Sequence, residues 1–273
     1  MNKLPESFSF FWKLFTGITA AELFRYFIAA GIAWAFFYVV IRRRYLHRKI
    51  ISGFPHFRDV RRELVLSLLT CGVYGLVGVI MFVPIKRNWT QMYFDIHAYG
   101  WKWFLASIVI TIFLHDTYFY WTHRLMHSPR LFPIMHRSHH RSTNPTPWAA
   151  YAFNPLEAFV QAGIFPLAIF LYPIHPLAFL IFMGWQITFN VLGHAGFEFH
   201  PRWFLDSRLG KFANTPTNHA MHHEFFTGNY GLYFNIWDRL MGTNHKDYET
   251  RFREVTSRPK HPAPTPEIVV ERQ

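Results

Sequence analysis

The sequence has little of what a soluble domain or a thiolate metal protein requires. Charged residues make up only 16% of its 273 residues, and none lies between residues 64 and 85. The single cysteine, Cys71, excludes an internal disulfide bond and a thiolate metal cluster. A phosphate-binding glycine loop, a dinucleotide fingerprint, a serine nucleophile elbow and a haem-attachment motif are all absent. The chain therefore carries no recognisable haem, flavin or other electron carrier of its own.

Long apolar runs are present instead, in a chain that is 51% hydrophobic. Runs of about 20 residues at 20–41, 64–85 and 104–122 have the length that a helix needs to cross a bilayer. Residues 152–194 are apolar for about twice that length, and Pro173 and Pro176 interrupt them. We expect a helical hairpin with arms at 152–172 and 174–194, which either crosses the membrane or re-enters it. The sequence thus predicts a single-domain, all-α integral membrane protein with four to five membrane helices.

The net charge of +12 indicates orientation rather than a nucleic-acid partner, because the basic residues flank the apolar runs. Eight Lys or Arg residues lie in 42–62, against two in the first 18 residues and three in 86–102. This bias predicts that 42–62 is cytoplasmic, together with a helical cap formed by 123–150 and the chain from 195 onward. The membrane would be of the bacterial inner or endoplasmic-reticulum type. Residues 254–273 are predicted to form a loose, proline-rich tail.

Histidines recur at helical spacing near the cytoplasmic ends of these runs. Residues three or four apart share a helix face, so each motif is expected to aim its imidazoles at a common point. The pattern His-x-x-His-His occurs twice, and the nitrogens outnumber the ligands of one tetrahedral site, which predicts two metal ions. The candidate ligands are His123, His127, His136, His139, His140, His194, His219, His222 and His223.

Three further polar residues are candidate auxiliary groups of this site. Asp116 lies on the helix face of the first histidine motif, where it would orient a ligand, bind metal or simply pair with Arg124 or water. Glu157 is the only charge between Arg141 and Glu198, so we expect it to meet the metal site, water or a histidine. Asn190, four residues before His194, is a candidate orienting residue or weak ligand.

A histidine-bound metal pair in a membrane protein without its own electron carrier predicts an oxygen-activating enzyme that a partner supplies with electrons. One alternative is a metal-transport or metal-storing membrane protein, because histidines within the membrane also mark ion pathways. That alternative requires ligands near mid-bilayer, whereas the motifs lie at one face. A second alternative is a catalytically inactive member of the same fold.

The motifs resemble those of the membrane fatty acid hydroxylase and sterol desaturase superfamily. The similarity covers a catalytic core of about 110–245, half of the chain. It rests on five segments in the expected order, which are Asp116-Thr-Tyr-Phe-Tyr-Trp-Thr-His-Arg-Leu-Met-His127, Asn190-Val-Leu-Gly-His-Ala-Gly-Phe-Glu198, Thr215-Pro-Thr-Asn-His-Ala-Met-His-His223, Asn229-Tyr-Gly231 and Trp237-Asp-Arg-Leu-Met-Gly-Thr243.

The resemblance implies a centre of two iron ions per chain held by the nine histidines, with dioxygen as co-substrate. It also implies a lipid or sterol substrate, hydroxylation or desaturation of a C–H bond, and electrons from a cytochrome b-type or ferredoxin-type donor. The sequence departs from the family at two positions. Asn190 stands where many relatives have histidine, and Asn154-Pro-Leu-Glu157 stands where many have His-Pro-x-Glu. Either the centre has one imidazole fewer or another group completes it.

Overall fold

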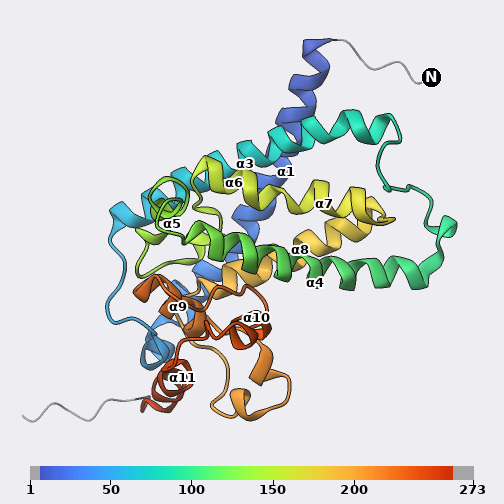
Figure 1. The fold of residues 1–273 in the computed structure, drawn as a ribbon. Helices are drawn as coiled ribbons and strands as arrows, with labels where there is room; N and C mark the ends of the chain where they lie inside the picture. Colours follow the sequence, from blue (N-terminus) through green and yellow to red (C-terminus); the bar gives the residue numbers. More distant parts are fainter. Residues whose placement is uncertain (1–6, 261–273) are drawn as a thin grey trace, which may run out of the picture.

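The computed structural model describes residues 7–260, and helices make up its regular structure, with no strand in that range (Figure 1). Four helices are long and apolar enough to cross a membrane, which confirms the predicted all-α membrane architecture. They are α1 (Phe8–Trp34, continued by π-helical turns at Ala35–Val40), α3 (Phe57–Lys86), α4 (Gly100–Met126) and α8 (Pro176–Gly193).

Two of these helices begin well before the apolar runs that indicated them. The helix α1 begins at Phe8 rather than near residue 20, because the Ser7 side chain caps it by accepting from the Phe10 N–H. The helix α3 begins at Phe57 and carries its first turns through a charged segment. Hydropathy marks only the part of a helix that is apolar, whereas charged residues such as Arg and Glu also form helices readily.

The predicted hairpin runs the length of the bundle. Its first arm consists of α6 (Pro155–Ala162) and α7 (Ile164–Leu171), and its second arm is α8. At the tip, the Tyr93 N–H donates to the Ile174 carbonyl (3.2 Å) and the Trp103 indole donates to the Pro173 carbonyl (2.8 Å). The tip therefore meets the α3–α4 connection, at the end of the bundle opposite the histidine motifs.

Prolines begin helices here rather than only breaking them. The pairs Asn154-Pro155, His175-Pro176 and Thr215-Pro216 each place proline in the first turn, where its missing N–H costs no hydrogen bond. The preceding side chain accepts a backbone N–H in each case. One of these caps starts α9 (Pro216–Phe225), the helix that carries the last three of the nine candidate ligands.

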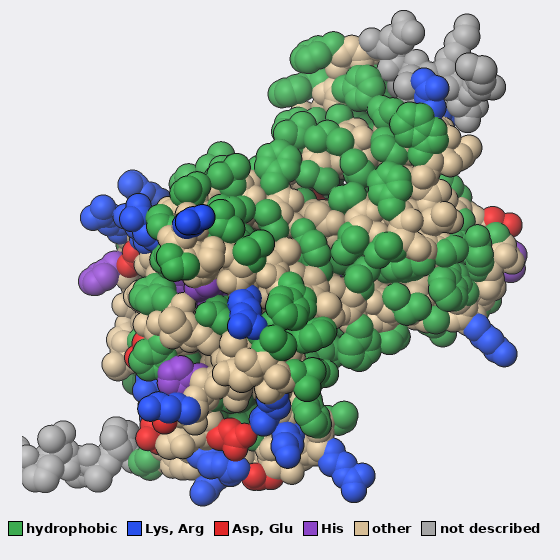
Figure 2. Space-filling model, in the orientation of Figure 1, with side chains coloured by type: hydrophobic (Ala, Val, Ile, Leu, Met, Phe, Trp, Pro, Cys, Tyr) green, Lys and Arg blue, Asp and Glu red, His purple; other side chains and the backbone are tan. Residues whose placement is uncertain are grey.

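The membrane-type helices pack around a central space. The helix α3 packs on α1 and on α6, α7 packs on α4, and α8 packs on both α4 and α1. Large apolar side chains such as Phe24, Leu105 and Leu180 stay exposed on the outside of this ring. Hydrophobic side chains cover much of the face of the bundle seen in Figure 2, whereas most of the Lys and Arg side chains on this face lie over the end that carries the cap. Such a surface suits lipid rather than water.

Most of the remaining short helices form the predicted cap at one end of the bundle (Figure 1). Contacts join this cap to the basic loop that follows α1, since Lys49 Nζ donates to Asn144 (2.7 Å) and Arg258 donates to the Lys49 carbonyl (2.6 Å). The cap elements are η4 (Phe132–His136), α5 (Arg137–His140), η5 (Pro147–Tyr151), η6 (Phe204–Asp206), η7 (Gly210–Phe212), α9, α10 (Ile236–Leu240) and α11 (Tyr248–Ser257). Three short helices lie outside the cap: α2 (Arg42–Tyr45) and η2 (Leu46–Arg48) belong to the basic loop, and η3 (Ile96–Ala98) precedes α4.

The helix α11 includes the start of the region predicted to be a loose tail. Residues 254–257 are helical because α11 buries Phe252 and Val255 against the cap. Residues 261–273, which hold most of that tail, lie outside the described residues.

Small residues let α1 and α3 approach closely. A Cβ atom on Gly75 would lie 2.1 Å from Thr19 Oγ1, and one on Gly78 would lie 2.8 Å from Ile18 Cδ1. The threonine side chain is β-branched and has little rotamer freedom in a helix with which to move away. Close approach at small residues is a common way for helices to associate in lipid, where the hydrophobic effect does not drive them together.

Replacing Gly75 by alanine is expected to destabilise the fold by about 1–3 kcal/mol, because the added methyl group overpacks the α1–α3 contact. Gly72→Ala, on the same helix, is the matched control, since a Cβ there meets nothing within 4 Å. Thermal unfolding in mild detergent, followed by circular dichroism, measures both. Equal unfolding temperatures for the two variants would contradict this account of the helix contact.

Candidate metal centre

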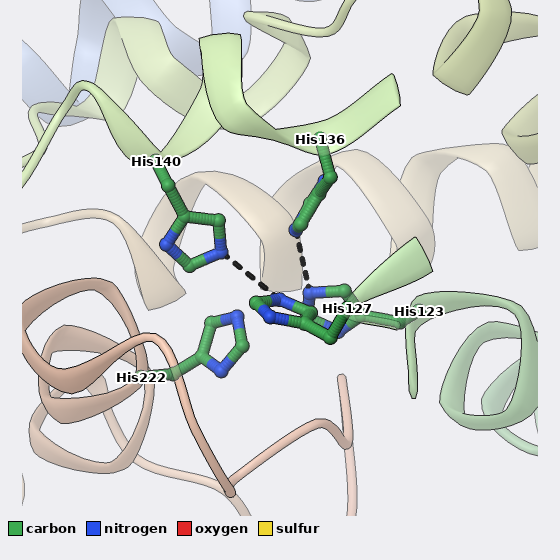
Figure 3. A group of neighbouring side chains, drawn as sticks. All are labelled: His123, His127, His136, His140 and His222. Atoms are coloured by element: carbon green, nitrogen blue, oxygen red, sulfur yellow. Dashed lines mark hydrogen bonds between the residues drawn. The ribbon is translucent and has the colours of Figure 1, made fainter. Parts of the chain in front are cut away.

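Five histidines from three segments of the chain face one another in the cap (Figure 3). The end of α4, the η4–α5 segment and α9 supply them, and one ring nitrogen from each lies within 4.8 Å of the others. All but one are buried. This group, called the His222 cluster, consists of His123, His127, His136, His140 and His222.

The other four predicted ligands form a second buried group, called the His194 cluster. It consists of His139, His194, His219 and His223, whose ligand atoms also lie within 4.8 Å of one another. The Nε2 atom of His194 is 3.0 Å from that of His219 and 3.2 Å from that of His223. The structure thus brings all nine predicted histidines together, in two groups rather than one.

Each histidine doublet is divided between the two clusters. His139 and His140 are neighbours on α5 but join different clusters, and so do His222 and His223 on α9. Successive residues on a helix point about 100° apart, so a doublet cannot aim both rings at one ion. The expectation of one common point per motif is therefore wrong for the doublets. The rings of His140 and His223 stack at 4.9 Å, which places the clusters side by side.

Backbone carbonyls fix the orientation of three of these rings. The Nδ1 atoms of His123, His222 and His194 lie 2.7–2.8 Å from the carbonyl oxygens of Tyr230, Gly228 and Asn190. A carbonyl oxygen only accepts hydrogen bonds, so each Nδ1 carries the proton and each Nε2 of the neutral ring carries a lone pair. Such contacts set the tautomer of metal-bound histidines.

The resulting arrangement of lone pairs fits a cation. In the His222 cluster the Nε2 atom of His222 is buried without a hydrogen-bond partner, and the His123 ring, with the same tautomer, is 4.5 Å away. Buried acceptors without a donor are costly, whereas a metal ion would satisfy several of them at once. A donor set of neutral imidazoles suits iron, zinc, copper and nickel, so the residues present fit the iron that the family resemblance implies.

The environment keeps the cap histidines in the uncharged form that binds metal. Burial, reinforced by neighbouring imidazoles, lowers the pKa of His136, His140, His219 and His222 well below the usual value. The same two causes lower the pKa of His223. Protons therefore compete weakly for these nitrogens near neutral pH.

Glu157 lies beside the His222 cluster. Its Oε1 atom is 2.7 Å from Nδ1 of His136, at angles that fall short of a regular hydrogen bond, and both side chains are buried. A carboxylate behind a metal-bound imidazole orients the ring and raises its basicity. Glu157, the one charged residue of the hairpin, therefore has a histidine as its partner. This is one of the three environments expected for it.

Asp116 and Asn190 contact the site through the backbone. The Asp116 carboxylate accepts from the Tyr233 and Phe234 N–H groups (2.8 and 3.2 Å), and its own role as an auxiliary group stays a prediction. The side-chain amide of Asn190 donates to the Ala150 carbonyl (2.7 Å). The main-chain carbonyl oxygen of Asn190 accepts from His194 Nδ1.

Sequence reasoning did not single out Asp238 or the carbonyl groups of the loop before α10. The Asp238 carboxylate accepts from the N–H groups of Tyr230 and Gly231 (2.9 and 2.7 Å), in the loop whose carbonyls orient His123 and His222. Two aspartates, from α4 and α10, therefore hold one loop against the His222 cluster. The available signal was the resemblance of segments 229–231 and 237–243 to the family's motifs, which have no spacing rule of their own.

An apolar cavity of about 390 Å³ lies within the bundle, and its lining comes close to the clusters without including any of the nine histidines. Five helical segments line it, namely α1, α3, α4, α6–α7 and α8. At its cap end lie Phe119 and Phe153, whose rings are 4.9 Å from His123 and 5.3 Å from His139. A long apolar molecule in this cavity would reach the edge of the histidine clusters.

Comparison with known proteins agrees with these motifs. Residues 108–243 match the model of the fatty acid hydroxylase family. A Delta(7)-sterol 5(6)-desaturase of Gibberella zeae is 31% identical over 79% of this chain and 67% of its own length. A Delta(7)-sterol 5(6)-desaturase of Aspergillus fumigatus is 28% identical over 84% of this chain and 73% of its own length. Lathosterol oxidase of Mus musculus is 29% identical over 76% of this chain and 69% of its own length.

No solved structure gives a significant match to the chain. The residues matched by the family model include all nine histidines of the two clusters. The chain therefore belongs to the fatty acid hydroxylase and sterol desaturase superfamily.

Proposed function

We propose that the chain is a membrane oxidoreductase that uses two iron ions and dioxygen to hydroxylate or desaturate a lipid or sterol. The observation that carries this proposal is the position of nine imidazoles in two adjoining clusters, next to Phe119 and Phe153 at one end of a cavity between membrane helices. The relatives support the substrate class, since their names describe sterol desaturation and lathosterol oxidation. The three auxiliary groups proposed for the reaction are Glu157, Asp116 and Asn190.

The nine histidines would hold the metal pair, with the five of the His222 cluster around one ion and the four of the His194 cluster around the other. Iron bound there would supply dioxygen activation and the removal of hydrogen from an unactivated C–H bond. Glu157 would hold the proton on His136 Nδ1, and the Asn190 carbonyl would do the same for His194. Asp116 would act through the backbone of residues 233 and 234, which it anchors.

The cavity would position the substrate and exclude water. Its walls are mostly apolar, and aromatic rings stand between its interior and the clusters. Exclusion of water protects reactive species from side reactions and strengthens electrostatic interactions inside the site. Hydroxylation and desaturation differ in how closely a second C–H bond approaches the centre, and rates depend on such placement at about the ångström scale.

We further propose that electrons come from a cytochrome b-type or ferredoxin-type donor at the cap. The cap shares one end of the bundle with the basic loop after α1, and the positive-inside rule would place that end in the cytoplasm. The membrane would be a bacterial inner membrane or the endoplasmic reticulum.

The direct test of the function uses purified, iron-loaded protein in lipid nanodiscs that contain a Δ7-sterol. Oxygen, a reductant and either a ferredoxin-type or a cytochrome b-type donor are added, and lipids are analysed by mass spectrometry. We expect a sterol or lipid product that has lost two hydrogen atoms or gained one oxygen atom. Fully metallated protein that leaves every lipid unchanged with both donor types would refute the proposal.

Metal analysis is expected to find about two iron ions per chain, one for each histidine cluster. His222→Ala and His139→Ala each remove a ligand from a different cluster, so each variant should lose about one ion. His97→Ala, an exposed histidine at the far end of the bundle, is the matched control and should keep both. Elemental analysis of detergent-purified protein measures the content. Full iron content in both cluster variants, or tightly bound zinc that iron cannot replace, would contradict the assignment.

Glu157→Gln is expected to weaken metal binding by about 10–100-fold, because the amide loses the negative charge that supports His136. Competition with a chelator, followed by the iron that the protein retains, measures the change. Glu254→Gln, a substitution of an exposed glutamate with the same chemistry, is the control. Equal iron retention in the two variants would remove Glu157 from the centre.

A further inference from the structure

Two phenylalanine side chains lie between the His222 cluster and the surface of the cap. The Phe132 ring is 5.2 Å from the His127 ring and 5.6 Å from the His140 ring. The Phe226 ring is 5.1 Å from the His140 ring and 6.2 Å from the Phe132 ring. Neither phenylalanine lines the apolar cavity, so this pair covers the cluster elsewhere. We call Phe132 and Phe226 the outer wall.

The outer wall is one side chain thick at Phe226. This residue is 38% exposed, whereas His140, whose ring it contacts, is 1% exposed. His127, which contacts Phe132, is the one partly exposed member of the nine histidines. A movement of one aromatic side chain would therefore open the His222 cluster to the outside of the protein.

The backbone of Phe226 adopts a conformation that a bulky side chain disfavours. Its φ and ψ angles are 61° and 2°, in the left-handed region, and its N–H donates to the His222 carbonyl (2.9 Å) at the end of α9. Glycine, or less often asparagine, usually occupies this position at a helix end, because other side chains are strained there. Strained residues of this kind cluster at functional sites, which indicates that the ring of Phe226 has a role.

A buried metal centre needs a path by which the metal ion enters. A hydrated cation would lose its water ligands without replacement in the apolar cavity, whose lining includes none of the nine histidines. At the outer wall the ion has to pass one aromatic ring before it meets His127 and His140, whose imidazoles can replace its water ligands.

We propose that ferrous iron enters and leaves the His222 cluster at the outer wall, and that the side chain of Phe226 moves to let it pass. The ring closes the site without binding the ion, so it controls the rate of exchange and not the affinity. This inference rests on the proposed function for the presence of iron in the cluster.

The rates of iron loss and iron uptake test the outer wall. For loss, the full chain loaded with ferrous iron in phosphatidylcholine nanodiscs, without oxygen, is mixed with excess ferrozine, a water-soluble chelator whose iron complex is coloured. For uptake, ferrous iron is added to the metal-free chain, unbound iron is removed at set times, and bound iron is measured by elemental analysis. The iron retained against graded chelator concentrations gives the affinity.

Phe226→Ala is expected to speed both iron loss and iron uptake by about tenfold, because local opening no longer requires an aromatic ring to leave its contacts. The affinity should match that of the unaltered protein, since both rates change by the same factor. Phe225→Ala is the matched control and should keep the original rates. Phe225 is 42% exposed, and its ring stacks on His245 (4.8 Å) rather than on a cluster histidine.

Single-cluster backgrounds assign the effect to one ion. The His139→Ala protein is expected to keep the ion of the His222 cluster, and Phe226→Ala should accelerate its loss there as well. The His222→Ala protein is expected to keep the other ion, whose rate of loss should not depend on Phe226. Acceleration confined to the His222→Ala background would overturn the assignment of the path to the His222 cluster.

Phe226→Gly separates the effect of the ring from a general loosening of the cap. Glycine adopts a positive φ without strain, so the metal-free glycine variant should unfold at a higher temperature than the alanine variant. Its iron should nevertheless exchange as fast as that of the alanine variant. Unchanged exchange rates in both Phe226 variants would overturn the proposal. Faster loss without faster uptake would also overturn it, because that result indicates weaker ligands.

The outcome separates this inference from the proposed function. Iron exchange that depends on Phe226, in protein that never oxidises a lipid, would refute the function and leave the entry path. Lipid oxidation by protein whose iron exchange is independent of Phe226 would refute the entry path and leave the function. Folded protein that binds no iron would refute both.

Discussion

The structure depends on holding nine uncharged imidazoles with their lone pairs turned inward, out of contact with water. For three of the rings a hydrogen bond to a backbone carbonyl leaves the nitrogen that faces the cluster unprotonated, as for His123 and His222, whose Nδ1 groups donate to the carbonyls of Tyr230 and Gly228. Such an arrangement is unfavourable in isolation, because the lone pairs repel and lack donors. It becomes favourable with a cation, so the cap is organised around an interaction that the protein atoms alone do not complete.

The rest of the cap keeps this arrangement rigid. Asp116 and Asp238 come from different helices, yet both anchor the loop that supplies the orienting carbonyls. Glu198, fully buried, accepts from the Thr217 backbone and hydroxyl groups at the start of α9, the helix that contributes to both clusters. Buried carboxylates are costly unless hydrogen-bonded, and here their partners are backbone groups that must be fixed for the ligands to be fixed.

The membrane helices contribute the cavity that lies next to the histidine clusters. Helices that would otherwise pack tightly enclose a cavity that begins next to Phe119 and Phe153 and extends toward the hairpin tip. Its wall is mostly apolar, and its polar members include the Glu22–Arg25 ion pair, Gln161 and Gln186. In the proposed function, the end of the cavity near the clusters is where the reacting C–H bond would lie.

The sequence by itself determined the membrane helices. Crossing a bilayer needs about 20 apolar residues, and the length of such a run can be read from the sequence without knowing how the helices pack. It also identified the nine histidines as candidate ligands, because histidines three or four residues apart recur more often than chance would give. Only the tertiary structure decided that His139 and His140 belong to different clusters, and that Glu157 lies beside His136. Local spacing fixes the direction of a side chain relative to its own helix, whereas the meeting of α4, α5, α8 and α9, and of Arg25 with Tyr151, depends on how separate helices pack.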